Sequence, residues 1–306
     1  MRKIYFILCV KIFTVCDIFI GGVTMNCTEI TKLQILADKA RLGAVIGTFH
    51  AKSGHPGGSL SAADIFTYLY FKEMNVDPAN PDMADRDRFV LSKGHCCPSL
   101  YATLALKGYF EWEELLKLRK IGAMLQGHPD MKGTPGIDMS SGSLGQGISA
   151  ACGMALAAKL DNKDYRVYTV LGDGECEEGQ VWEAAMFAAH KELDNLVVFV
   201  DQNGLQIDGT VEEVGGIEPL DKKFEAFGFE VVKIDGHNFN DIEAALNKAR
   251  ETKGRPTAIL AKTVKGQGVS FMENQVGWHG KACNADELAI ATKELEEKIA
   301  KLEAEL

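Results

Sequence analysis

In its middle the chain reads Arg166-Val167-Tyr168-Thr169-Val170-Leu171, and the polar turn Gly172-Asp173-Gly174-Glu175 follows at once. The first run is short, apolar and rich in β-branched and aromatic residues, which is typical of a buried strand. Helix-forming residues then carry an apolar face over 181–191, and a second apolar run occupies 196–200. A strand, a helix and a strand of these lengths predict two neighbouring parallel strands joined by a crossover helix.

Asp173 and Asn203 follow the two predicted strands closely, so both should lie at the carboxyl edge of the sheet, where open α/β sheets bind ligands. Carboxylate and amide oxygens beside a glycine-rich turn suit a hard divalent cation that also holds a diphosphate. The structural alternative is that Gly-Asp-Gly is only a turn and Asn203 only caps a loop. The strand context on both sides favours the binding site. No dinucleotide fingerprint follows the first strand and no Walker pattern occurs, which disfavours nicotinamide enzymes and P-loop triphosphatases.

The bulk composition limits the classes of protein and partner. With 306 residues and 46% hydrophobic composition, the chain can bury a large core as one big domain or two ordinary ones. Its 33 basic and 43 acidic residues give a net charge of −10, which argues against nucleic acid or an anionic membrane as a main partner. Cys96 and Cys97 are adjacent, and no Cys-x-x-Cys pair occurs among the eight cysteines. This pattern fits reduced thiols in a cytoplasmic protein.

Strand and helix patterns alternate along most of the chain, which indicates a doubly wound α/β fold with a mostly parallel sheet and helices on both faces. Ser59 or Ser61 is expected to cap a helix that reaches about Phe71. The other expected strands are 88–91, 230–234 and 257–261, and the other expected helices are 30–50, 98–106, 111–119, 148–160 and 240–251.

The two ends of the chain differ from its body, residues 25–285. Residues 1–24 form an apolar N-terminal extension that Lys11 and Asp17 interrupt. We expect Met25 to be the true start, with a secretory signal or an anchor as the alternative. Residues 286–306 are predicted to form a charged amphipathic helix, typical of a solvated surface helix.

Four of the seven histidines lie in glycine-flanked loops: His55, His95, His128 and His279. Glycine lets the backbone approach a ligand closely while the imidazole projects into the cleft. A lone histidine is more often a surface or core residue, but four in this setting indicate a cleft that binds phosphate or hydroxyl oxygens. Their spacings do not match zinc ligand sets. The three remaining histidines lack the glycine context on at least one side and are expected to be structural: His50, His190 and His237.

The segment from Asp173 to Asn203 is similar to the thiamine-diphosphate signature, which opens with Gly-Asp-Gly and closes with an asparagine about thirty residues later. Further motifs follow one another in a fixed order: Ser53-Gly54-His55-Pro56-Gly57, Leu91-Ser92-Lys93-Gly94-His95, Gly127-His128-Pro129, Gly142-Ser143-Leu144-Gly145-Gln146-Gly147 and Trp278-His279-Gly280-Lys281. Together they resemble the amino-terminal third of transketolases over roughly residues 28–285. Residues 25–285 are therefore expected to be a thiamine-diphosphate-binding domain with the corresponding fold.

The resemblance implies a role for each matching residue. Metal ligands for Mg²⁺, or for Ca²⁺ or Mn²⁺, would be Asp173, Asn203 and the carbonyl of Leu205. Residues toward the cofactor diphosphate would be His95, Gly174, His279 and Lys265, and those beside the thiazolium Gly142 and Leu144. Catalytic residues facing the sugar would be His55 and His128, assisted by His279. Glu178 and Glu183 match acids at the dimer interface that are linked to the cofactor's pyrimidine, although acids at a helix start also favour the helix dipole.

Transketolases also carry a pyrimidine-binding domain and a C-terminal domain, which this sequence does not contain. We therefore expect a split transketolase, a transferase in which this chain is the N-terminal subunit and a C-terminal subunit supplies the missing domains, in a cytoplasmic heterotetramer. The pair would move a two-carbon ketol unit between sugar phosphates, as in the pentose phosphate pathway. This chain would show negligible ketol transfer by itself.

Three alternatives remain open. The α-subunit of a 2-oxoacid dehydrogenase has the same kind of metal site, and deoxyxylulose-phosphate synthase is another relative. The loops around His55 and His128 favour a polyhydroxylated sugar over a 2-oxoacid. The third alternative is a non-catalytic thiamine-diphosphate-binding protein, which has no need of sugar-facing imidazoles.

Overall fold

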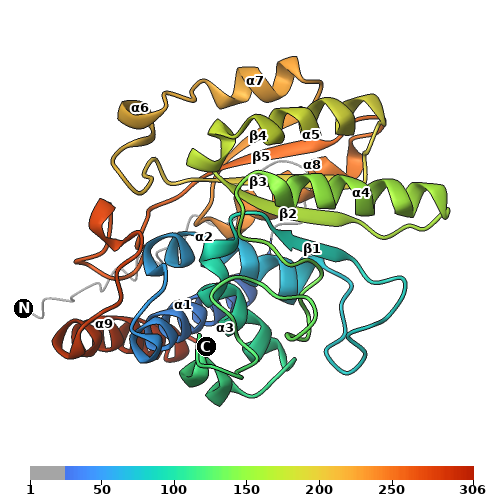
Figure 1. Cartoon of the computed structure of the whole chain (residues 1–306). Coiled ribbons are helices and arrows are strands. Elements are labelled where there is room, and N and C mark those ends of the chain that lie inside the picture. The colour runs from blue at the N-terminus through green and yellow to red at the C-terminus, as the bar shows by residue number, and fades with distance from the viewer. Residues whose placement is uncertain (1–24) are drawn as a thin grey trace, which may run out of the picture.

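The computed structural model describes residues 25–306. The expectations for residues 1–24 lie outside this range. Five strands form one wholly parallel sheet in the order β1-β2-β3-β5-β4 (Figure 1). Their bounds are Arg88–Leu91 for β1, Val167–Gly172 for β2, Leu196–Gln202 for β3, Glu230–Asp235 for β4 and Thr257–Lys262 for β5. All five predicted strands are confirmed to within two residues at either end.

The two strands that the sequence singled out are direct neighbours. β2 and β3 pair in parallel, and Gly172 lies opposite Asp201 at the end of the ladder. Asp173 and Asn203 therefore leave the sheet at almost the same level, one from each strand. The strand register alone thus brings the two predicted metal ligands to one edge of the sheet.

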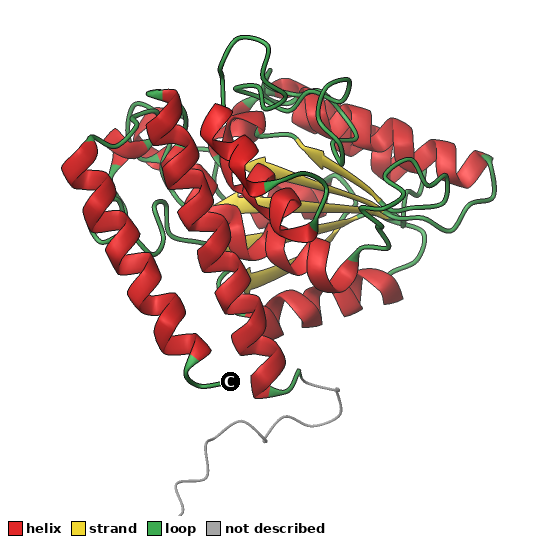
Figure 2. Cartoon of the chain, turned by 90° about the horizontal axis from the view of Figure 1, so that it is seen from below, coloured by secondary structure: helices red, strands yellow, loops and turns green. Residues whose placement is uncertain are grey.

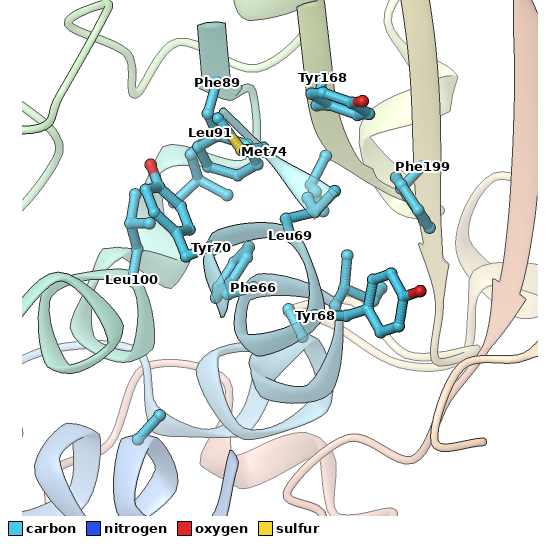
Figure 3. Close-up of a cluster of buried hydrophobic side chains, with 14 of the residues drawn as sticks. Phe66, Tyr68, Leu69, Tyr70, Met74, Phe89, Leu91, Leu100, Tyr168 and Phe199 are labelled. Atoms are coloured by element: carbon cyan, nitrogen blue, oxygen red, sulfur yellow. The ribbon is translucent and has the colours of Figure 1, made fainter. Parts of the chain in front are cut away.

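Alternate residues of each strand point to opposite faces of the sheet, and both faces are covered by helices. On one face Phe89, Tyr168 and Phe199 belong to a buried cluster that also contains Phe66 and Leu100 (Figure 3). On the other face Val90, Leu171 and Val198 belong to a second buried cluster. Continuous apolar runs in the strands are the consequence, because a strand buried on both faces cannot alternate apolar with polar residues.

The helices divide between the two faces (Figure 1). The first face carries α2 at Pro56–Tyr68, α3 at Cys97–Lys107 and α8 at Phe239–Glu251, with α1 at Cys27–Ala51 packed on α2 and α3. The second face carries α4 at Gln146–Leu160, α5 at Gly179–His190 and α7 at Leu220–Ala226, while the short α6 at Val211–Val214 follows the loop after β3. The doubly wound α/β fold is confirmed.

The C-terminal helix α9, Ala285–Glu303, lies along α1 (Figure 2). Ala291, Leu295 and Ile299 are buried along its inner side, one turn apart, while its outer side is charged. At its start the Asn284 side chain accepts the amide hydrogen of Glu287, whose own carboxylate accepts from the Asn284 amide. One side of this amphipathic helix is therefore solvated and the other completes the core over α1. Within residues 25–306 no helix is both long and apolar enough to cross a membrane.

Two local predictions are wrong. Helix α2 begins at Pro56, and neither Ser59 nor Ser61 is its cap. Proline at the first helical position starts the helix early, so that Gly57 and Gly58 belong to its first turn. Its glycines are required by close packing, since a Cβ on Gly57 would lie 2.8 Å from the Trp278 carbonyl oxygen. The helix expected at 111–119 is a 3₁₀ segment, Trp112–Lys117.

Candidate active site

A cavity of about 280 Å³ opens where the tips of β2 and β3 meet the loops that contain the predicted histidines. It is lined by nearly all the residues to which the resemblance assigns a role toward the cofactor, the metal or the sugar: His55, His95, Gly142, Leu144, Asp173, Gly174, Asn203, Leu205, Lys265 and His279. These residues come from segments that are distant in the sequence. The parallel sheet brings them together because the carboxyl ends of its strands share one edge.

Asp173 stands at the tip of β2 and is almost fully buried. Its carboxylate accepts hydrogen bonds from the backbone amides of Gly174 at 2.8 Å and Gly204 at 2.5 Å. Burial raises the pKa of Asp173 to about 6, although the Gly204 amide opposes this shift. A carboxylate held this far from water gains strongly from a cation at the same position.

The tip of β3 supplies two further oxygens. The Asn203 side-chain oxygen accepts from the Leu205 amide at 3.1 Å, and the Leu205 carbonyl accepts from the Lys265 ammonium at 2.8 Å. The same Lys265 nitrogen lies 3.0 Å from Nδ1 of His279. Burial and the neighbouring Lys93 lower the pKa of Lys265 to about 8. Lys265 therefore carries a poorly solvated positive charge directly beside the predicted metal ligands.

The glycine-loop histidines form one group. The His55 ring centroid lies 5.2 Å from that of His95, 5.5 Å from that of His279 and 6.3 Å from that of His128. Burial is the first cause that lowers the pKa of each imidazole, to about 4 in His55 and to about 3 in His279. All four are therefore neutral at pH 7, so each ring presents one N–H donor and one acceptor nitrogen. Among residues 25–306 the buried Nδ1 of His55 finds no hydrogen-bond partner.

The floor of the cavity is a buried ion pair that sequence reasoning missed. The Lys93 ammonium contacts the Asp201 carboxylate, which also accepts from the hydroxyl groups of Ser61 and Thr263. Burial alone would lower the pKa of Lys93, but Asp201 overrides it and holds that pKa above its usual value. The sequence did contain a signal, since both charged residues stand at the ends of apolar strands. Charged residues in such positions are rarely buried without a partner, so an ion pair could have been expected there.

Glu175 is a second missed residue. Its buried carboxylate accepts from the Ser92 hydroxyl at 2.6 Å and from the amides of Gly145 at 2.8 Å and Gly172 at 3.1 Å. These contacts join the loop of Gly142 and Leu144 to the tips of β1 and β2. The signal was the acid two residues after Asp173, at the first turn that follows a buried strand.

Three residues that the resemblance picked out are not part of the cavity lining. His128 lies next to it, with its ring close to Gly142, where an added Cβ would come within 3.1 Å of the imidazole. Glu178 and Glu183 are exposed at the start and on the outer side of α5. The structure thus gathers the cofactor and metal candidates and sets the two acids apart on the surface.

The residues present fit both a diphosphate and a divalent cation. The oxygen donors of Asp173, Asn203 and Leu205 are of the kind that Mg²⁺ and Ca²⁺ prefer. The described residues contain no group of three or more His, Cys, Asp and Glu side chains that could hold a metal ion. A site with one carboxylate agrees with this, because Mg²⁺ is commonly bound by one or two carboxylates together with phosphate oxygens. The unsatisfied Nδ1 of His55 is a further sign that the cavity accommodates a polar ligand.

Comparison with known proteins agrees with this geometry. Residues 33–301 match the family model of the transketolase thiamine diphosphate binding domain. The chain is 50% identical over 245 residues to the 6-deoxy-6-sulfo-D-fructose transketolase subunit SqwG of Clostridium sp., covering 80% of this chain and 89% of that protein. It is 42% identical to an apulose-4-phosphate transketolase subunit of Phocaeicola vulgatus, covering 90% of this chain and 98% of that one.

The crystal structure of transketolase from Campylobacter jejuni superposes with a TM-score of 0.80 at 31% identity and covers 92% of this chain and 48% of that one. The chain spans less than half the length of the solved transketolases that it matches. These relatives favour transketolase over the 2-oxoacid dehydrogenase, deoxyxylulose-phosphate synthase and non-catalytic alternatives. The chain therefore belongs to the transketolase family, in which it corresponds to the N-terminal, thiamine-diphosphate-binding subunit of enzymes divided between two chains.

Proposed function

We propose that this chain acts with a C-terminal subunit to transfer a two-carbon ketol unit from a ketose to an aldose. One observation carries the proposal: the cavity joins the oxygen donors of Asp173, Asn203 and Leu205 to imidazoles from three separate loops, and the imidazole of a fourth loop lies beside it. The oxygen donors suit a cation and a diphosphate. The imidazoles suit a substrate with several hydroxyl groups, because each neutral ring can donate and accept one hydrogen bond.

Asp173, Asn203 and the Leu205 carbonyl would hold Mg²⁺, with Ca²⁺ or Mn²⁺ as substitutes. His95, His279, Gly174 and Lys265 would contact the diphosphate, and Gly142 and Leu144 would lie beside the thiazolium. When bound, thiamine diphosphate supplies the carbanion chemistry of the carbon–carbon bond exchange. The chain's own contribution is to neutralise the diphosphate and to orient the cofactor.

His55 and His128 would hydrogen-bond the sugar hydroxyls, with His279 assisting. The lowered pKa values of the three rings keep them neutral at pH 7, so each can take a proton from one oxygen and return it to another. His55 is the best placed of them, since its buried Nδ1 has no partner within the described part of the chain. That nitrogen can therefore bind a substrate hydroxyl without breaking a bond inside the protein.

The partner would dock on the outer side of the α4–α5 pair (Figure 1). Leu160, Met186 and Phe187 are 72%, 54% and 39% exposed there, and large exposed apolar groups mark interaction sites when they gather on one face. Glu183 is exposed on the same helix, and Glu178 at its start. A heterotetramer would bury both acids near the cofactor of a neighbouring subunit.

The substrates would be sugars with an anionic terminal group. The names of the two subunit relatives specify a sulfonated ketose and a sugar phosphate. Both sugars carry a strong anion, so a phosphate and a sulfonate donor should be compared. The buried thiols of Cys96, Cys97, Cys152 and Cys176 support a reducing cytoplasm as the compartment, as expected for enzymes of pentose phosphate metabolism.

The test is reconstitution of the purified chain with its C-terminal subunit, thiamine diphosphate and Mg²⁺. We expect ketol transfer from the pair, negligible transfer from this chain alone, and loss of activity on chelation that added Mg²⁺ reverses. His55→Ala and His128→Ala should each reduce kcat/KM by about a hundredfold, the range for removal of one acid–base group.

His190→Ala is the matched control, because His190 is exposed at the end of α5. Full turnover in the His55 and His128 variants would show that the chain only binds the cofactor. Ketol transfer by the isolated chain would contradict the requirement for a second subunit.

A further inference from the structure

A second buried network of charges lies away from the cavity, between helices α1 and α2. The Arg41 guanidinium contacts two carboxylates, Asp38 of the same helix at 2.8 Å and Asp64 of α2. Arg41 also donates to the Leu60 carbonyl at 3.1 Å. All three charged side chains are almost completely buried, so their positions are tightly constrained. Asp64 is the member of this network that contacts His237, just after the carboxyl end of β4.

His237 continues the network to the strand tips. It follows β4, and its Nδ1 lies 2.6 Å from the Asp64 carboxylate. Its Nε2 accepts the backbone amide hydrogen of Val264 at 2.9 Å. An amide can only donate, so Nε2 carries no proton and Nδ1 must carry it. Asp64 thereby fixes both the ring orientation and the tautomer in which His237 can hold Val264.

Val264 immediately precedes Lys265, whose ammonium reaches the Leu205 carbonyl and His279. The residues on both sides of Lys265 are held in place. Thr263 donates to Asp201, Val264 donates to His237, and the Gly266 amide donates to the Gly57 carbonyl at 2.9 Å. Among these three partners, Asp201 belongs to the cavity floor, Gly57 accepts through its backbone carbonyl, and His237 contributes a side chain from outside the cavity lining.

We infer that His237, oriented by Asp64, is a positioning residue that sets the backbone from which Lys265 reaches the cofactor diphosphate. This inference rests on the proposed function, in which Lys265 contacts that diphosphate. His237 was expected to be structural because it has a glycine neighbour on one side only. Its contacts assign it a second role, since they connect the charged residues between α1 and α2 to Val264, the residue before Lys265.

Two substitutions separate the halves of the His237 contact. Asparagine places an amide nitrogen near the position of Nδ1, so His237→Asn keeps the bond to Asp64 and loses the acceptor for Val264. Glutamine places an amide group near the position of Nε2, so His237→Gln keeps an acceptor for Val264. Both variants are assayed in the reconstituted two-subunit enzyme, with thiamine diphosphate titrated at fixed Mg²⁺ and binding followed by tryptophan fluorescence.

We expect His237→Asn to raise the apparent Kd for thiamine diphosphate about tenfold, the effect of losing one hydrogen bond that orders a charged group. His237→Gln should stay within about twofold of the unsubstituted protein, because a neutral acceptor is retained. In the background of Lys265→Met the asparagine substitution should cause no further change in Kd, since its effect passes through the missing ammonium.

Leu246→Ala serves as the control for stability, because Leu246 is buried in α8 away from the cavity. It should lower the melting temperature without changing the Kd. The inference is overturned if His237→Asn binds the cofactor as tightly as the unsubstituted protein, or if its effect on Kd adds fully to that of Lys265→Met. Ketol transfer by the unsubstituted pair tests the proposed function separately, whatever these variants show.

Discussion

The protein contains two buried charge networks of different design. The cavity-floor pair consists of Lys93 and Asp201, one cation and one carboxylate directly beneath the cofactor cavity. The helix network consists of Asp38, Arg41 and Asp64, and it has an outside contact at each end, Lys298 and His237. Among the described residues Lys93 and Asp201 each form an ion pair only with the other. In the helix network, each carboxylate has a second partner besides Arg41, namely Lys298 for Asp38 and His237 for Asp64. The first depends on a single ionic contact, and the second distributes its charge over three helices and a loop.

Lys93→Met should have the largest effect on stability. It leaves the Asp201 carboxylate buried with hydrogen bonds but without a cation, which costs about 3–5 kcal/mol of unfolding free energy. Urea unfolding of the isolated chain measures this cost. The double substitution Lys93→Met with Asp201→Asn should recover much of it, because no charge then remains unpaired. A single variant as stable as the unsubstituted protein would remove the distinction between the two networks.

Arg41→Met should destabilise less, by about 2 kcal/mol, although it disrupts two ion pairs at once. Asp64 retains His237 and Asp38 retains Lys298, so neither carboxylate is left without a hydrogen-bonding partner. The same urea experiment provides the comparison. A loss equal to that of Lys93→Met would show that the outside contacts give no protection.

Acidification should act at the cavity end of the molecule. Burial lowers the pKa of His55 from 6.5 to about 4 and that of His279 to about 3. Below pH 6.5 these histidines therefore bind more protons in the unfolded chain than in the folded chain. The free energy of unfolding consequently decreases as the pH is lowered. The pKa of Asp173 is raised to about 6, so below that pH this carboxylate binds protons more readily in the folded chain and stabilises it as the pH is lowered.

The net loss between pH 7 and pH 5 should stay below about 2 kcal/mol, since both imidazoles are partly exposed to solvent. Urea midpoints at pH 7, 6 and 5 measure it. His279→Asn should flatten the pH dependence, because it removes one of the imidazoles whose pKa is lowered in the folded chain. A steeper dependence in His279→Asn would contradict the assignment of neutral imidazoles.

The smallest effect is expected for Lys298→Met, about 0.5 kcal/mol or less, because the Lys298 side chain is 44% exposed and its ion pair is screened by water. Thermal unfolding with and without 0.5 M salt, roughly enough to screen such pairs, checks this. Combined with Arg41→Met the substitution should cost clearly more than the sum of the two, since Asp38 then loses every cation that contacts it within residues 25–306. Simple additivity would argue against mutual support within the helix network.

Much of the site could be predicted from the sequence because its signals are local. Asp173 and Asn203 directly follow apolar runs, and each of the four histidines of the glycine-flanked loops sits in its own short motif. Partners that are far apart in the sequence could not be predicted in this way. Lys93 and Asp201 are separated by 108 residues, and nothing in either neighbourhood specifies the other. The start of α2 was misplaced for a related reason, since Gly57 is required by its contact with Trp278.

Local stretches of sequence specify the strand and helix types, their alternation and the residues at the strand ends, since periodicity and turn chemistry act over a few residues. The packing of the whole chain settles which charges are paired, which imidazoles are desolvated and which segment His237 holds. This follows because burial sets the strength of a charge interaction, and burial is a property of the packed molecule. In the sequence Lys93 is simply a lysine that follows a strand, and only the packing of the chain places it at the cavity.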